Sequence, residues 1–165
     1  MAFPATPHSQ IKMYDNIKKF LRGFVYAARG IAYNIKTQRN FRFHIVAAVW
    51  VLLLSFFYDF GRTEYALLMV TFSSVMALEA VNTAIESAVD LVTDGERRKL
   101  AGLAKDAAAG AVLIAAVFAV AVAVFLFWDT AVFCRIGEFL LDYPLSILFA
   151  AALAVCSFIF VFKGK

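Results

Sequence analysis

Three carboxylates and one amide recur at helical spacing in the middle of a long apolar segment. They are Glu79, Asn82, Glu86 and Asp90, separated by three, four and four residues. On a helix that turns by about 100° per residue, these side chains fall within an arc of roughly 80°. Acidic groups are costly within a membrane unless they face a protein interior, a polar cavity or a metal. The spacing therefore predicts a helix whose acidic stripe belongs to a functional site.

Further polar residues stand at the starts of the neighbouring apolar segments. Lys105 and Asp106 precede one of them, and Gln38 and Arg42 precede another. Carboxylates, a lysine and an amide together suit a divalent metal and a triphosphate. The sequence contains no G-x-x-x-x-G-K-[ST] loop and no protein-kinase signature, so a nucleotide site here is of an unrelated type. Taken alone, Asp106 also fits a helix N-cap, and Lys105 fits an anchor at the membrane surface.

The composition is that of a membrane protein. Hydrophobic residues make up 63% of the 165 positions and charged residues 17%, whereas soluble domains average about 45–50% apolar and about 25% charged residues. Cys134 and Cys156 lack the spacing of metal ligands. Because the basic residues flank apolar segments, the net charge of +4 indicates an anionic membrane surface as the partner, and no nucleic acid.

The elements that must position the polar residues are one amphipathic segment and four apolar ones. We predict an all-α membrane protein with an N-terminal amphipathic surface helix, a core of three transmembrane helices and a fourth, C-terminal transmembrane helix. The expected ranges are a flexible tail at 1–10, the surface helix at 11–37, spans at about 41–60, 65–92 and 106–128, and a loop with the extra span at 129–165.

Basic residues are distributed unevenly around these predicted spans. Fourteen of the 16 Lys and Arg residues lie on the side that holds the N-terminus, and only Arg62 and Arg135 lie on the other. The positive-inside rule then predicts a multi-pass protein with both termini in the cytoplasm. This topology brings the polar residues of three spans to the cytoplasmic interface.

The segment from about residue 20 to residue 128 resembles a known family. The sequences EAVNTAIESAVD at 79–90 and LAGLAKDAAAGAVL at 100–113 are similar to those of the small bacterial integral-membrane diacylglycerol kinases and undecaprenol kinases. Tyr26, Gly30 and the RNFRFH junction at 39–44 add to the likeness. The resemblance implies a Mg²⁺-dependent enzyme of the bacterial inner (plasma) membrane that transfers the γ-phosphate of ATP to the hydroxyl of a membrane lipid. It also implies a homotrimer with active sites shared between neighbouring subunits.

The resemblance implies a role for individual residues as well. Glu79 matches the catalytic carboxylate, which would act as a general base on the lipid hydroxyl, and Asn82 matches a supporting residue. Glu86 matches a metal-binding glutamate. The positions implied to contact the nucleotide are Lys19, Tyr26, Glu86, Asp90, Glu96, Lys105 and Asp106, and those implied to contact the lipid are Arg42 and Ala109.

Two positions depart from the family pattern. Gln38 stands where a second metal-binding glutamate is usual, and residues 96–98 are ERR where EYH is usual. An amide oxygen can bind Mg²⁺ but brings no negative charge, so Gln38 stays in the predicted metal site as a weaker ligand. The alternative hypothesis is a non-catalytic homologue that binds lipid or nucleotide. An ion pathway is disfavoured because the polar residues gather near one membrane face. The choice between diacylglycerol and undecaprenol as acceptor stays open.

Overall fold

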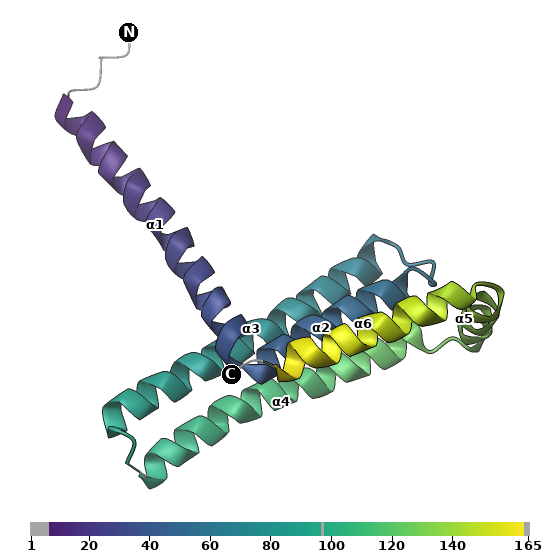
Figure 1. Ribbon diagram of the computed structural model, residues 1–165. Helices are drawn as coiled ribbons and strands as arrows, with labels where there is room; N and C mark the ends of the chain where they lie inside the picture. The colour runs from purple at the N-terminus through teal and green to yellow at the C-terminus, as the bar shows by residue number, and fades with distance from the viewer. Residues whose placement is uncertain (1–6, 97, 164–165) are drawn as a thin grey trace. The chain divides into compact units, whose positions relative to one another are not determined.

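The computed structural model describes residues 7–96 and 98–163, with side chains from residue 16 onward. This part of the chain forms six helices and contains no strand, which confirms the predicted all-α class. The helices are α1 (Pro7–Thr37), α2 (Arg39–Ser55), α3 (Arg62–Thr93), α4 (Lys99–Phe127), α5 (Thr130–Asp142) and α6 (Pro144–Phe162) (Figure 1).

The chain divides into two units, residues 1–33 and residues 34–165. The first unit consists of most of α1, which begins at Pro7 and not at the expected residue 11. A proline fits this first helical position, because its missing N–H would have no intrahelical partner there. Large apolar side chains such as Phe20, Leu21 and Phe24 are exposed on this helix, and basic residues lie between them. That pattern is typical of a helix that lies on a membrane surface.

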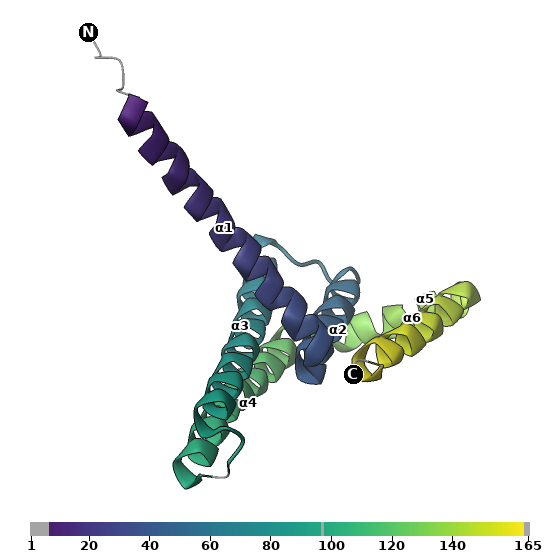
Figure 2. The ribbon, with the colours of Figure 1, turned by 60° about the vertical axis from the view of Figure 1, so that its left-hand side comes forward.

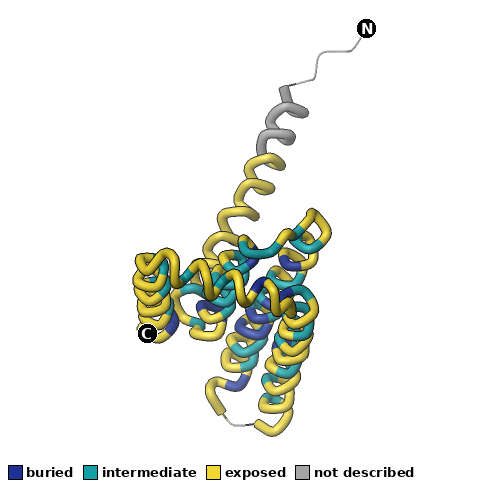
Figure 3. Tube along the Cα trace, turned by 90° about the vertical axis from the view of Figure 1, so that its right-hand side faces the viewer, coloured by how far each residue is buried: buried dark blue, intermediate teal, exposed yellow. Residues whose placement is uncertain are grey.

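In the second unit α2, α3, α4 and α6 run in similar directions in the view of Figure 1, whereas Figure 2 shows α3 and α4 close together and α6 diverging from them. Helix α3 packs mainly on α4, α2 packs on both α3 and α6, and the short α5 packs on α6. Buried residues are restricted to the faces where these helices meet, and most of the remaining surface is exposed (Figure 3). Exposed apolar residues on α4, among them Leu113, Ile114 and Phe118, are expected where a helix faces lipid or another membrane helix.

Within the described residues, three helices are long and apolar enough to cross a membrane, namely α3, α4 and α6. Helix α2 is shorter than the predicted span at 41–60, since it ends at Ser55 after 17 residues. It measures about 25 Å at 1.5 Å per residue. The N–H groups of Phe56, Phe57 and Tyr58 bond to carbonyls three residues back, which tightens the chain into a turn. The last turn that the sequence predicted for helix α2 is therefore absent.

Two boundaries near the polar residues also differ from expectation. Helix α4 begins at Lys99, so Lys105 and Asp106 lie well inside it and not at its start. The alternative of Asp106 as an N-cap is thereby overturned. Residues 130–142, expected as part of a loop, form α5, whose N-cap Asp129 accepts hydrogen bonds from the N–H groups of Ala131 and Val132. A carboxylate at this position satisfies backbone donors that the first helical turn leaves unpaired.

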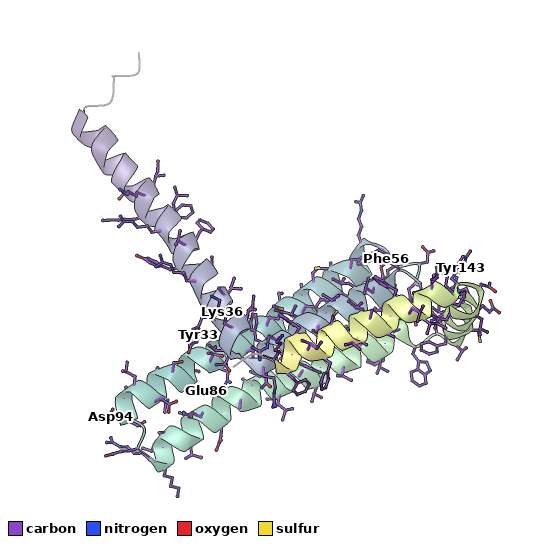
Figure 4. All side chains as sticks on the ribbon, viewed as in Figure 1. Tyr33, Lys36, Phe56, Glu86, Asp94 and Tyr143 are labelled. Atoms are coloured by element: carbon purple, nitrogen blue, oxygen red, sulfur yellow. The ribbon has the colours of Figure 1, made fainter. Side chains whose placement is uncertain are left out.

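An aromatic cluster joins the α2–α3 connection to the end of α4. The Tyr58 hydroxyl donates a hydrogen bond of 2.6 Å to the carbonyl of Phe127. The Tyr58 and Phe127 rings meet edge to face at 4.9 Å, and Phe60 packs against both. These contacts fix the end of the α2–α3–α4 unit that lies opposite the polar residues, as the positions of Phe56 and Asp94 in Figure 4 indicate.

Candidate active site

The acidic stripe on α3 passes from buried to exposed along the helix. Glu79 and Asn82 are buried, with 3% and 8% of their surface exposed. Glu86 is half-buried and Asp90 is exposed. Figure 4 shows Glu86 on α3, between the middle of the bundle and the α3–α4 turn marked by Asp94. The deep end of the stripe is thus enclosed by protein, while the other end reaches the surface.

Hydrogen bonds connect the stripe internally and to α2. The Asn82 Nδ2 group donates to Glu86 Oε1 over 3.1 Å. The side chain of Asn40, on α2, forms a hydrogen bond with Glu79, and Glu86 is close enough to repel Glu79 electrostatically. Asn40 was not singled out from the sequence, although it lies within the RNFRFH junction. Its place beside Glu79 depends on how α2 packs on α3, which the local pattern does not specify.

One buried polar atom in this region has no partner among the described residues. The Oδ1 atom of Asn82 is enclosed, yet it accepts no hydrogen bond there. Buried polar atoms are nearly always paired, so an unpaired carbonyl oxygen in a native fold requires an explanation. An oxygen beside the carboxylate of Glu86 is suited to a cation or to a donor group of a substrate.

An ion pair joins the shallow end of the stripe to α4. The Lys105 Nζ atom lies 2.6 Å from Asp90 Oδ1, and the two side chains are 34% and 60% exposed. The sequence reasoning expected these residues at one interface, and the pairing of α3 with α4 brings them into contact. The neighbouring Asp106 is exposed.

A polar cavity of about 400 Å³ occupies the α3–α4 turn. Asp90 and Lys105 line it together with Glu96, which forms an ion pair of 2.9 Å with Arg98. Arg98 and Lys99 also line the cavity, although the sequence reasoning assigned them no role. The run of basic residues after Glu96 is the sequence feature from which their place in the site could have been predicted. Lys105 and Arg98 are paired with carboxylates here, and ammonium and guanidinium groups of this kind also bind the phosphates of a nucleotide.

A second cavity, of about 180 Å³, is almost wholly apolar and lies between α2, α3 and α4. Val75, one helical turn before the buried Glu79, contributes to it, as do His44 and the small side chains of Ala116 and Ala119. The apolar lining of this slot matches the polarity of a hydrocarbon chain, and on α3 it extends from Leu68 to Val75, one turn before Glu79.

Other predicted site residues are not joined to this group by any described contact. Gln38 is half-buried and adopts an extended backbone between α1 and α2. Lys19 and Tyr26 are exposed in the separate N-terminal unit, and Ala109 is exposed on α4. The described residues contain no group of three or more His, Cys, Asp or Glu side chains placed to hold a metal.

Arg42 is buried and bonds only to backbone carbonyls. Its guanidinium donates to the carbonyls of Ile35 and Lys36 at the end of α1, and to that of Val161 near the end of α6. With 4% of its surface exposed, the side chain ties three helix ends together. The predicted contact of Arg42 with lipid stays a prediction beside this structural role.

Comparison with known proteins identifies the family. Residues 25–127 match the family model described as prokaryotic diacylglycerol kinase. The chain belongs to the prokaryotic diacylglycerol kinase family. This result confirms the family predicted from the sequence and, with it, a membrane enzyme of the lipid kinase class. The comparisons give no support to the alternative of a non-catalytic homologue.

Relatives within this kinase family carry two different names. An undecaprenol kinase of Bacillus subtilis is 40% identical over 113 residues, which are 68% of this chain and 91% of the relative. A diacylglycerol kinase of Synechocystis is 45% identical over 102 residues, 62% of this chain and 58% of the relative. The diacylglycerol kinase of Escherichia coli K12 is 30% identical over 111 residues, which are 67% of this chain and 90% of the relative. The family match ends where α4 ends, so α5 and α6 lie outside the kinase region.

Proposed function

We propose that this lipid kinase transfers the γ-phosphate of ATP to the hydroxyl of undecaprenol or diacylglycerol. The observation that carries the proposal is the placement of buried Glu79 between an apolar slot and a chain of polar groups that leads to a cationic cavity. A lipid hydroxyl must be delivered from the hydrocarbon side and a nucleotide from the aqueous side. The two cavities on either side of the stripe match these two demands.

The reaction assigns a distinct task to each part of the stripe. Glu79 accepts the proton of the lipid hydroxyl while the hydroxyl oxygen forms a bond to the γ-phosphorus. The bond from that phosphorus to the β–γ bridging oxygen breaks, and ADP leaves. Asn40 orients the Glu79 carboxyl through its hydrogen bond. Lys105, held near the cavity by Asp90, offsets the negative charge of the phosphates.

The donor set on α3 fits the magnesium ion that such a transfer uses. Mg²⁺ takes oxygen ligands, commonly one or two carboxylates together with substrate phosphates. Glu86 would hold it, with the unpaired Asn82 Oδ1 beside it and Gln38 as a further ligand. When bound, the ion supplies neutralisation of phosphate charge. We include Lys19, Tyr26, Glu96 and Asp106 in the proposed nucleotide site and Arg42 and Ala109 in the proposed lipid site.

We propose a homotrimeric assembly in the bacterial inner membrane with both termini in the cytoplasm. The distribution of basic residues supports this orientation. The exposed apolar faces of α4 and α6 leave surface for contacts between subunits. Crosslinking in native membranes, followed by mass determination, tests the number of subunits.

Phosphate transfer from labelled ATP tests the proposed function directly. The purified protein, reconstituted with Mg²⁺ and with either undecaprenol or diacylglycerol, should label one of the two lipids. Glu79→Gln should reduce the rate by about 10²–10⁴-fold, the usual contribution of a general base. Glu138→Gln, an exposed carboxylate on α5 outside the kinase region, serves as the matched control and should leave the rate unchanged. Equal rates for Glu79→Gln and the original protein would remove Glu79 from the mechanism, and labelling of neither lipid would overturn both acceptors.

A further inference from the structure

The appended helix α6 helps to form an open groove at the α1–α2 junction. The groove has a volume of about 580 Å³ and lies at the end of the bundle where α6 terminates. Figure 4 labels Lys36 at this junction. Its basic lining residues are Lys36, Arg42 and Lys163, and its apolar wall is formed by Cys156, Ile159 and Phe160. Because α6 lies outside the region matched by the kinase family, this groove is a feature of the present chain.

The positive charge of the groove is not balanced by the described residues around it. None of the described residues that line it carries a carboxylate. The guanidinium of Arg42 bonds to carbonyls alone and forms no ion pair with a described residue. Lys36 and Lys163 are exposed, and their ammonium groups have no partner among the described side chains. Two exposed lysines and a buried arginine thus face the same space.

Compensation of helix dipoles accounts for only part of this arrangement. Cations at helix C-termini are favourable, and both α1 and α6 end here. Arg42, however, already donates hydrogen bonds to the last turns of both helices. Arg39 adds a further cation at the same end, with its guanidinium 5.8 Å from the centre of the Phe162 ring. The charges of the two lysines are therefore not required to compensate the dipoles of α1 and α6.

We propose that this groove binds the phosphate headgroup of an anionic phospholipid from the surrounding bilayer. The basic groups match the charge of the phosphate, since Lys and Arg at a membrane surface attract anionic headgroups. The apolar wall on α6 continues from the basic rim toward the membrane-spanning part of that helix, so an acyl chain attached to the phosphate has a surface to lie on. A soluble anion would leave that wall uncovered. The proposal does not depend on the catalytic role of α3.

Lipid binding to charge variants tests the proposal. The intact protein in detergent is titrated with phosphatidylglycerol or phosphatidylcholine, and bound lipid is counted by native mass spectrometry. Lys36→Gln with Lys163→Gln should weaken the tightest phosphatidylglycerol site by roughly thirtyfold, at about fivefold for each lysine, and should leave phosphatidylcholine binding unchanged. Lys18→Gln with Arg22→Gln removes the same charge from α1 outside the groove and should have less than a threefold effect. Equal losses in both double variants, or none in either, would overturn the proposal.

The two cysteines allow a second test in the unmodified protein, which does not require the variants to fold. Cys156 lines the groove, whereas Cys134 lies on α5 and is not part of its lining. Both thiols are exposed. Phosphatidylglycerol nanodiscs should slow alkylation of Cys156 by a membrane-permeant maleimide at least threefold relative to phosphatidylcholine nanodiscs, with Cys134 unchanged. An equal change at both cysteines, or no change at either, would refute occupation of the groove.

Discussion

The ion pair between Lys105 and Asp90 allows a structural role to be separated from a role in the reaction. The two side chains are 34% and 60% exposed, so water screens their attraction. Pairs of this kind stabilise a fold by about 0.2–1 kcal/mol. Loss of a group that stabilises charge in the transition state costs much more, about 2.7–4 kcal/mol, or roughly 10²–10³-fold in rate. The two roles therefore predict effects of different size.

The perturbation is Lys105→Gln, measured alone and together with Asp90→Asn. We expect the single lysine variant to lose roughly 10²–10³-fold in kcat/KM for ATP at saturating lipid. Its free energy of unfolding should fall by no more than about 1 kcal/mol. Asp90→Asn alone should cost less, up to about 100-fold, because it misplaces Lys105 but leaves its charge. The assay is the initial rate of lipid labelling, with stability followed by denaturation in the same detergent.

A double-mutant cycle completes the design. If both residues act through the same phosphate contact, the double variant should be no slower than Lys105→Gln. Arg135→Gln, which removes an exposed cation of α5 outside the kinase region, is the matched control and should keep kcat/KM within threefold. The reasoning is refuted if Lys105→Gln retains its kcat/KM, or if its loss of activity is accompanied by an equally large loss of stability.

Three further predictions concern the metal, the buried amide and the appended helix. Gln38→Glu adds a charged oxygen ligand and should lower the Mg²⁺ concentration that gives half-maximal activity, measured by titration; an unchanged midpoint would place Gln38 outside the metal site. Asn82→Leu should reduce the rate at least tenfold while costing little stability, since the unpaired Oδ1 is removed with its partnered amide; full activity would contradict a role in the site. Trp50→Phe removes the 3.2 Å bond to Ser157 and should destabilise the packing of α6 on α2 by about 0.5–1.5 kcal/mol, seen as faster proteolysis after α4; unchanged proteolysis would argue against that contact.

The class of the fold and the centre of the site could be predicted because they depend on local spacing. The separations of three and four residues placed Glu79, Asn82, Glu86 and Asp90 along one helix, and α3 carries them so. The excess of apolar residues fixed the membrane class in the same way. Neither inference required knowledge of which helix packs on which.

Helix boundaries were harder to predict, because a single residue can be compatible both with a helix and with a loop. The predicted spans left residues 93–105 as a connection, and Gly102 lies within it. The cost of a glycine in a helix, about 1 kcal/mol, is smaller than the combined helix preference of the neighbouring Leu, Ala and Lys residues. Helix α4 accordingly begins at Lys99. Similarly, Phe56 and Phe57 extended the apolar run, but the chain turns after Ser55 to bring Tyr58 onto Phe127.

Contacts between distant segments could not be predicted at all. Arg42 is 119 residues from Val161 in the sequence, and nothing in either local pattern links them. The same is true of Asn40 beside Glu79, which depends on how closely α2 approaches α3. Such contacts arise from tertiary packing, which the hydrophobic periodicity and the helix propensity of each segment do not predict.

The gradual change in exposure along α3 bears on a problem that every ATP-dependent transferase faces, the competition from water. As the proposed base, Glu79 would be kept by its burial from activating solvent, and hydrolysis of the nucleotide by water would be suppressed until the lipid hydroxyl binds. The same enclosure would trap the proton after each turnover. Glu86, which accepts a hydrogen bond from Asn82, and then exposed Asp90 would provide carboxylates nearer the aqueous phase to which that proton could be passed. One helix face would thus keep water out of the reaction and still let its by-product escape.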